Sequence, residues 1–291
     1  MERVRRFIHC EIPMSEGLTG KRSTVVIFDT GLAMHPDFSG RVVSFRDFVH
    51  DQTAAYDDNG HGTHLAGIIG GSGEASGGRY MGVAPDVNFV ICKVLDHFGN
   101  GQIETVLRAV DWVIKNRQNY QINLLNISIG MLPKVDNRDQ LEFVHALQHL
   151  WDLGIFIVAA AGNNGPGVST VTVPGTIPEL LTVGSIDDED SVLSGGMRSG
   201  YSGRGPTKSC ITKPEVLAPG TQLISTSHRK SGYTAKSGTS MATAVVTGGM
   251  AVLSDAYELP PKELKLLLYS KLKRVRGRTD WGNFDFKSLL S

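Results

Sequence analysis

The chain of 291 residues carries 29 Lys and Arg against 29 Asp and Glu, and 41% of its residues are hydrophobic. This composition is typical of a globular protein, and the length fits one large domain. The even charge balance gives no electrostatic reason to expect a nucleic-acid or membrane-surface partner, so we predict neither. No apolar stretch approaches the roughly 20 residues needed to span a bilayer.

Three cysteines, Cys10, Cys92 and Cys210, are widely spaced along the chain. An odd number at these spacings argues against both a disulfide framework and a zinc cluster. Residues 1–20 lack the apolar core that a secretory signal requires. From these two observations we expect a cytoplasmic protein, and the sequence leaves its oligomeric state open.

Short apolar runs alternate with helical patterns, which predicts a parallel sheet wrapped by helices. The expected strands, in chain order, are residues 24–28, 87–94, 124–127, 155–159 and 180–183. The expected helices are residues 61–69, 103–114, 141–151, 241–256 and 261–272. Because no repeat or linker interrupts this pattern, we expect an N-terminal arm over residues 1–20 followed by a single domain over residues 21–291.

The segments that follow the predicted strands contain most of the polar chemistry. In sheets of this class, ligands bind at the carboxyl ends of the strands. Asp29 follows the first strand, and residues 128–130 and 161–163 follow two later ones. The sequence therefore predicts that these three segments meet at one edge of the sheet.

A nucleophilic hydrolase needs a hydroxyl, a base and a group that orients the base. Asp29 closes a buried strand, where a carboxylate needs a partner, although it could instead cap the following turn. His61 stands between glycines at the start of a predicted helix, with Asp58 or Asn59 as the expected cap. His61 and His64 could alternatively form a metal pair, but no His-Glu-x-x-His motif supports that reading.

Ser240 begins a predicted helix of small residues, where backbone N–H groups favour developing negative charge. Ser237 is a competing nucleophile, but it lies in the preceding loop. Met241 and Ala242 follow Ser240, so the motif is not the Gly-x-Ser-x-Gly elbow of the α/β-hydrolases.

Three segments resemble the signature blocks of the subtilisin family of serine proteases: residues 27–31 (IFDTG), 59–67 (NGHGTHLAG) and 238–243 (GTSMAT). They stand in the Asp, His, Ser order of that family. Residues 45–60 and 201–220 are similar to its bacterial intracellular members. The resemblance covers nearly the whole chain and implies an α/β, subtilisin-like fold, with a mostly parallel central sheet and helices on both faces.

The resemblance also implies a serine endopeptidase that works through an acyl-enzyme intermediate. Asp29 would orient His61, which would take the proton from Ser240 and later give it to the leaving amine. Asn163 matches the asparagine of the family's oxyanion hole, together with the backbone N–H of Ser240. Asn164 is the rival candidate in the same segment.

In the family an extended peptide adds as a strand at the cleft, so the resemblance implies polypeptide substrates and broad specificity. Ile103, Val106 and Ile129 would line an apolar pocket for the residue four before the scissile bond, although Val106 could equally be a core position. The residues matched to substrate binding are Gly99, Asn100, Gly101, Ile103, Ser128, Ile129, Gly130, Ala160 and Gly162.

The loop of residues 70–78 replaces a segment that supplies calcium ligands in secreted relatives. It offers only Ser72, Glu74 and Ser76 as side-chain oxygens. Structural calcium therefore has no recognisable site, and we expect that catalysis requires no metal or other cofactor.

Two alternatives accompany this prediction. The first is a protease-like binding or regulatory protein on the same fold, whose mark would be a missing triad member, and none is missing. The second concerns residues 1–20, which either begin the fold as an ordered arm or lie extended across the cleft as an inhibitory segment.

Overall fold

The computed structural model describes residues 1–133, 138–190, 200–229, 231–272 and 282–291. Its centre is an eight-stranded sheet in the order β10-β7-β6-β5-β4-β1-β3-β2, and all neighbouring pairs are parallel. The strands are β1 Thr24–Asp29, β2 Val42–Asp47, β3 Asn88–Lys93, β4 Ile122–Ile127, β5 Phe156–Ala160, β6 Leu181–Ser185, β7 Val216–Ala218 and β10 Gly282–Asn283. A separate antiparallel hairpin pairs β8 Leu223–Thr226 with β9 Tyr233–Lys236.

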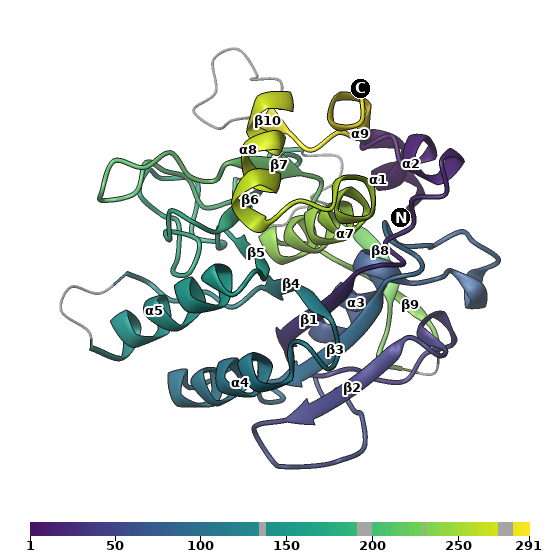
Figure 1. The fold of residues 1–291 in the computed structure, drawn as a ribbon, viewed down its shortest axis with the longest axis horizontal. Helices are drawn as coiled ribbons and strands as arrows, with labels where there is room; N and C mark the ends of the chain where they lie inside the picture. The colour runs from purple at the N-terminus through teal and green to yellow at the C-terminus, as the bar shows by residue number, and fades with distance from the viewer. Residues whose placement is uncertain (134–137, 191–199, 230, 273–281) are drawn as a thin grey trace.

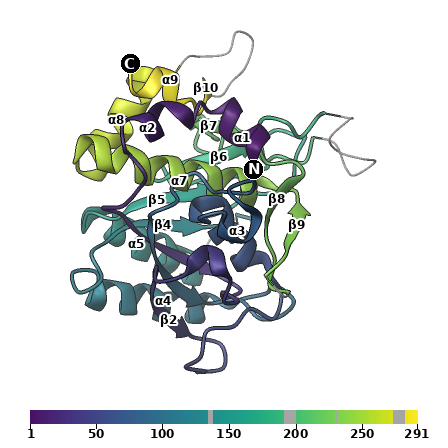
Figure 2. The ribbon, with the colours of Figure 1, turned by 90° about the vertical axis from the view of Figure 1, so that its right-hand side faces the viewer.

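Helices cover both faces of this sheet. Figure 2 shows α7 above β4 and β5, with α4 and α5 below them. On the upper face α3 packs against α7, and on the lower face α4 packs against α5. The α-helices are α1 Glu2–Phe7, α2 Glu11–Ser15, α3 His61–Gly70, α4 Ile103–Asn116, α5 Arg138–Asp152, α7 Thr239–Tyr257, α8 Pro261–Lys271 and α9 Phe286–Leu289, with 3-10 turns η1 Pro36–Phe38 and η2 Glu74–Ser76. The predicted fold class is confirmed.

The central strands are continuous apolar runs because helices bury them from both sides. All six residues of β1 and all five of β5 are buried. The edge strand β2 is different, because most of its residues are at least partly exposed and their polar and apolar types are mixed. Because of this mixed composition, the sequence analysis does not predict β2. The five strands that it predicts are all present.

Residues 1–20 form two short helices, so the extended form considered for this arm is wrong. Val4 and Ile8 are buried in the same core as the central strands. The guanidinium of Arg3 donates to the Asp187 carboxylate at 2.9 Å and to the Thr221 carbonyl at 2.6 Å. Figure 1 shows α2 beside α9 near the C-terminus. Helices this short are stable only through such tertiary contacts.

The three cysteines are free: Cys10 and Cys92 are buried and Cys210 is exposed. Burial raises the pKa of the Cys10 thiol to about 12, which keeps it protonated and unreactive. Within the described ranges, no helix combines the length and apolarity that crossing a membrane requires.

Candidate active site

Asp29 and His61 are joined by a hydrogen bond at the carboxyl end of β1. The imidazole Nδ1 lies 2.8 Å from one Asp29 carboxylate oxygen and 2.9 Å from the other. An ionised carboxylate can only accept, so Nδ1 carries the proton and Nε2 is left as the acceptor. The Asp29 side chain is fully buried, whereas a quarter of the His61 side chain is exposed. This tautomer is the one that a general base needs.

Glycines allow the two chain segments to approach this closely. A Cβ on Gly62 would lie 2.3 Å from the carbonyl oxygen of Gly31 and 3.2 Å from the Asp29 Cβ. A Cβ on Gly31 would lie 2.2 Å from the Tyr56 carbonyl oxygen, and its φ of +117° also favours glycine. The glycines next to Asp29 and His61 in the sequence blocks are thus a steric requirement.

The protonation of His61 is governed by opposing effects. Burial, the largest of them, lowers the pKa of His61, but the charge and hydrogen bond of Asp29 raise it. The positive charge of Lys236 lowers the pKa and the negative charge of Asp57 raises it. The net result is a pKa above the ordinary value for histidine. Because a general base must be neutral, His61 becomes competent only as the pH rises through this pKa.

Asp57 caps the start of α3, so the expected cap at Asp58 or Asn59 is only partly right. The Asp57 carboxylate accepts from the N–H groups of Gly60 at 2.7 Å and Thr63 at 2.9 Å. Asn59 contributes one bond, from the His61 N–H at 3.2 Å. Asp58 instead pairs with Lys93 at 2.7 Å. Asp57 is a residue that the sequence analysis missed.

Ser240 is the second residue of α7 and is 8% exposed. The first N–H groups of a helix have no partner within the helix, so the Ser240 N–H can donate to a ligand. The preceding Gly238 has a φ of +151° and donates its N–H to the Gly220 carbonyl at 2.9 Å. Ser237, the rival serine, accepts a hydrogen bond from the Gln222 N–H at 2.9 Å.

Asn163 follows β5 and contacts the start of α7. Its side-chain oxygen accepts from the N–H of Thr239 at 3.0 Å and from the Thr239 hydroxyl at 3.1 Å. These two donors fix the orientation of the amide, because the oxygen must face the backbone N–H. The amide nitrogen is therefore left to donate to a ligand next to Ser240. Asn163 is exposed, as an oxyanion-binding group should be before substrate binds.

Sheet order brings these groups to one edge. β1, β4 and β5 are neighbours and run parallel, so their carboxyl ends lie side by side. Asp29 ends β1, and Asn163 follows β5 and binds Thr239, the neighbour of Ser240. The edge predicted from the sequence therefore contains Asp29, His61, Asn163 and Ser240.

The predicted substrate-binding residues border the same edge. Residues 99–101 form an exposed turn, and the adjacent His97 carbonyl accepts from the Asn59 side chain at 3.0 Å. Ser128 and Gly130 are at least partly exposed after β4, whereas Ala160 is 3% exposed in β5. Gly162, with φ of +88°, directly precedes Asn163.

The three residues predicted to line an apolar pocket differ in exposure. Ile103 and Ile129 are partly exposed, whereas Val106 is 3% exposed and belongs to the hydrophobic core. The alternative reading of Val106 as a core residue is thus the one that its burial supports.

Thr172 is a second residue that the sequence analysis missed. Its side chain lies between the segments that follow β4 and β5. A Cβ on Gly130 would come within 2.6 Å of the Thr172 hydroxyl, and a Cβ on Gly162 within 2.5 Å. Thr172 is 3% exposed, and its N–H donates to the Ala161 carbonyl at 3.0 Å. It therefore packs beside the segment that leads to Asn163.

Lys93 is fully buried at the end of β3, and its side chain forms hydrogen bonds with three residues from different parts of the site. Its ammonium donates to the carbonyls of Thr30 at 2.7 Å and Leu95 at 2.9 Å, and to the Asp58 carboxylate at 2.7 Å. A buried lysine is tolerated only with such partners, and here all three of its N–H donors have one.

The His64 side chain is held by backbone carbonyls of the chain itself. Its Nε2 lies 3.0 Å from the carbonyls of both Leu223 and Thr234, so this nitrogen carries the proton. Burial lowers the pKa of His64 to about 3, which keeps it neutral. Among the described residues no group of three or more His, Cys, Asp or Glu side chains could hold a metal ion. In the loop of residues 70–78, Ser72 accepts from the Glu74 N–H and Ser76 donates to the Gly73 carbonyl.

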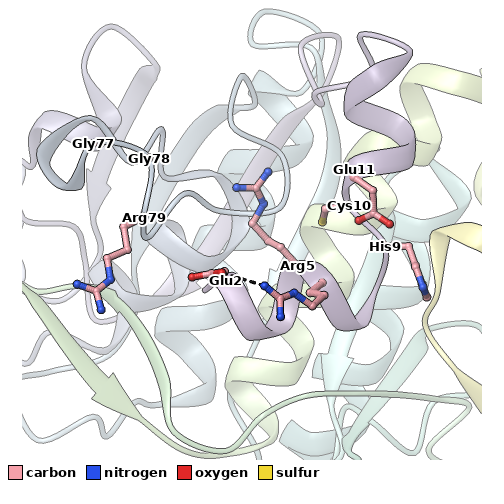
Figure 3. Close-up of a pocket in the computed structure, with 9 residues that line it drawn as sticks. Glu2, Arg5, His9, Cys10, Glu11, Gly77, Gly78 and Arg79 are labelled. Carbon is pink, nitrogen blue, oxygen red and sulfur yellow. Dashed lines mark hydrogen bonds and ion pairs between the residues drawn. The ribbon is translucent and has the colours of Figure 1, made fainter.

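A cavity of about 910 Å³ lies elsewhere, between α1 and the loop at Gly77 and Gly78 (Figure 3). Two of its charged side chains are paired with each other, since Arg6 binds Glu2 at 3.0 Å. Its lining contains none of Asp29, His61, Asn163 or Ser240, so we do not assign the chemistry to it.

Comparison with known proteins gives a consistent result. The profile of the subtilase family, Peptidase S8, matches residues 20–282. Serine protease AprX of Bacillus subtilis is 38% identical over 270 residues, which cover 86% of this chain and 61% of AprX. Subtilisin DY of Bacillus licheniformis is 31% identical over 246 residues, 84% of this chain and 80% of that protein.

A solved structure, described as a cold adapted subtilisin-like serine proteinase, superposes with a TM-score of 0.74 at 33% identity. The match covers 92% of this chain and 89% of that one. The family profile, the relatives and the fold agree, and the resemblance seen in the three sequence blocks is confirmed: the chain belongs to the subtilase family.

Proposed function

We propose that this chain is a serine endopeptidase that cleaves polypeptides through Ser240, His61 and Asp29. The observation that carries the proposal is the Asp29–His61 hydrogen bond, in the tautomer of a general base, at the edge where Ser240 stands in the first turn of α7. The chain spans only 61% of AprX, so the activity of a whole protein of that kind is part of the proposal.

In the proposed reaction His61 Nε2 takes the proton from the Ser240 hydroxyl as its oxygen attacks the scissile carbonyl carbon. The carbonyl oxygen becomes an oxyanion, which the Asn163 amide and the Ser240 N–H would bind. His61 then gives its proton to the leaving amine, and water repeats the sequence on the acyl-enzyme. Asp29 stabilises the imidazolium that forms in each half of the reaction. None of these steps requires a cofactor.

Labelling with a fluorophosphonate, followed by peptide mapping, tests this function directly. An activated serine oxygen attacks phosphorus, a P–O bond forms, and fluoride leaves as the P–F bond breaks. We expect one labelled residue, Ser240, in the wild-type chain. The absence of label, or label on Ser237 instead, would exclude the proposed triad.

The competing function, a protease-like binding or regulatory protein, would bind peptides without this reactivity. No observation favours it, because Ser240, His61 and Asp29 are all present and the last two are bonded. The same labelling experiment separates the two functions.

An extended peptide is proposed to lie between residues 99–101 and residues 128–130. Its scissile carbonyl would point toward Asn163, and the side chain of the residue that carries this carbonyl would then lie near Thr172, which packs against Gly130 and Gly162. Because Thr172 would take up part of the room for that side chain, we propose that small side chains are preferred there.

Replacing Thr172 by glycine is expected to enlarge the room for the substrate side chain before the scissile bond. With peptide anilides that differ only in Ala or Phe before the scissile bond, the kcat/KM ratio of Phe to Ala should rise about tenfold. Thr172→Ser is the matched control, because it keeps the hydroxyl that contacts Gly130 and Gly162 and should shift the ratio less. An unchanged ratio in Thr172→Gly would show that Thr172 does not border the substrate.

The division into an arm and a single domain of residues 21–291 stays a prediction, as does the cytoplasmic location. We propose a structural role for the arm, because Val4 and Ile8 join the core and the Arg3 side chain binds Asp187. Its hydrogen bonds to other segments reach Asp86, Asp187, Thr221, Ile224, Asp285 and Phe286, none of which belongs to the proposed triad.

A further inference from the structure

The segments that contain Asp29 and His61 are joined by more than their shared hydrogen bond. Residues 29–33 follow β1, and residues 57–63 lead into α3. Tyr56 accepts from the Leu32 N–H at 3.0 Å, and Gly31 and Asp57 form an isolated bridge. The relative position of these segments sets the geometry of the Asp29–His61 pair.

Asp57 is the first residue of the second segment, faces the first segment and is 7% exposed. One carboxylate oxygen accepts from the Thr30 hydroxyl at 2.8 Å. The other accepts from the Thr63 hydroxyl at 2.6 Å. The remaining bonds come from backbone N–H groups of residues 59, 60 and 63, at 3.1, 2.7 and 2.9 Å. Burial alone raises the pKa of Asp57, but these bonds outweigh it and hold the pKa below its ordinary value.

The two hydroxyls form crossed relays. Thr30, from the Asp29 side, accepts from the Gly62 N–H at 3.0 Å and donates to Asp57. Thr63, from the His61 side, accepts from the Ala33 N–H at 2.9 Å and donates to Asp57. The Asp57 carboxylate thus accepts a hydroxyl from each segment. Each of these hydroxyls in turn accepts an N–H from the other segment. Hydrogen bonds to an ionised group are about twice as strong as neutral ones, so Asp57 is well suited to fix this junction.

We propose that Asp57 is a positioning residue for the triad, which holds Asp29 and His61 in reacting geometry through the hydroxyls of Thr30 and Thr63. Asp57 touches neither substrate nor the reacting atoms. Its negative charge also favours the imidazolium form of His61, as the charge of Asp29 does. The inference rests on the proposed function, because it assumes that Asp29 and His61 belong to the triad.

The test is the pair of variants Asp57→Asn and Asp37→Asn, measured with a peptide anilide across pH. In Asp57→Asn an amide NH2 faces donors that need an acceptor. We expect kcat to fall about 10- to 100-fold from misplacement of the base. KM should stay within about twofold, because no substrate contact is lost.

The pH profile provides a readout that a purely structural role would not move. The charged and titratable groups around His61 include Asp29, Asp57, Lys236 and the neutral His64, and His228 packs against the preceding Gly60. Removing the negative charge at position 57 lowers the pKa of His61. The acid limb of kcat should therefore move to lower pH in Asp57→Asn.

Asp37 is the matched control, because it is likewise a buried and hydrogen-bonded carboxylate. It accepts from the Tyr233 hydroxyl at 2.9 Å and from the Ala75 N–H at 3.0 Å, both outside the two segments. Asp37→Asn should lower stability but leave kcat and its acid limb unchanged.

Thr30 provides a second variant that keeps the proposal testable if Asp57→Asn does not fold. Thr30→Val removes one relay and should lower kcat about tenfold, whereas Thr30→Ser restores the hydroxyl and most of the rate. Wild-type kcat and acid limb in a folded Asp57→Asn variant, or equal rates in the two Thr30 variants, would overturn the inference. Fluorophosphonate labelling of the wild type distinguishes this outcome from failure of the proposed function. If Ser240 is not labelled, the proposed function and the inference both fail. If Ser240 is labelled and the variants still behave in this way, only the inference fails.

Discussion

Replacing Ser240 or His61 by alanine should lower kcat by about 10⁶-fold, and replacing both should lower it scarcely further. The magnitude is the one measured in subtilisin itself. The reason for non-additivity is chemical: the Ser240 hydroxyl is a poor nucleophile without a base, and His61 has no proton to move without that hydroxyl. Turnover of a peptide anilide by the two single variants and the double variant measures the effect.

Ser237→Ala is the matched control for this series. Ser237 lies three residues before Ser240, and its hydroxyl accepts from the Gln222 N–H outside the helix. Its loss should leave turnover close to that of the wild type. The triad assignment would be wrong if the losses in the Ser240 and His61 variants multiplied in the double variant, since independent groups behave in that way.

The central strands and the triad residues could be predicted because their sequence signals are local. Buried parallel strands such as β1 and β5 are short apolar runs, and the residues that follow them are fixed at one edge by sheet topology. Asp29, His61 and Ser240 each stand in a block whose glycines or small residues have a steric reason. Gly62, for example, has no room for a Cβ beside Asp29.

The rest depends on contacts between distant parts of the chain. The helices of residues 1–20 are too short to be stable alone, and contacts such as Arg3 with Asp187 determine them. Thr172 meets Gly130 and Gly162 only because β4 and β5 are adjacent in the sheet. No periodic pattern could place its side chain there.

The cap of α3 has a local sequence signal, the acidic and amide residues before His61, but the residue that caps the helix is Asp57. The sequence analysis expects Asp58 or Asn59 to cap the helix. The chain instead turns at Gly60, with φ of +94°, which brings Asp57 under the first turn and leaves Asp58 to Lys93. Lys93 is fully buried and needs an anionic partner, which Asp58 provides, so the cap is left to Asp57.

Replacing Asn163 by alanine should lower kcat by about 10²- to 10³-fold with little change in KM, a magnitude known from the corresponding asparagine of subtilisin. The amide nitrogen is expected to bind an oxygen that is negatively charged only during the reaction, so its loss affects the transition state more than the bound substrate. Steady-state kinetics with one peptide anilide separates kcat from KM.

The geometry around Asn163 also sets the controls for this prediction. Asn163→Ala removes an acceptor from the Thr239 N–H, but the exposed position allows water to replace it. Thr239→Ser keeps the hydroxyl that binds the Asn163 oxygen and should retain most of the rate. Asn164 is equally exposed and should tolerate alanine without loss of kcat. If Asn164→Ala loses turnover while Asn163→Ala keeps it, the oxyanion-binding amide lies one residue later in the chain, and the orientation that Thr239 imposes on Asn163 serves only the fold.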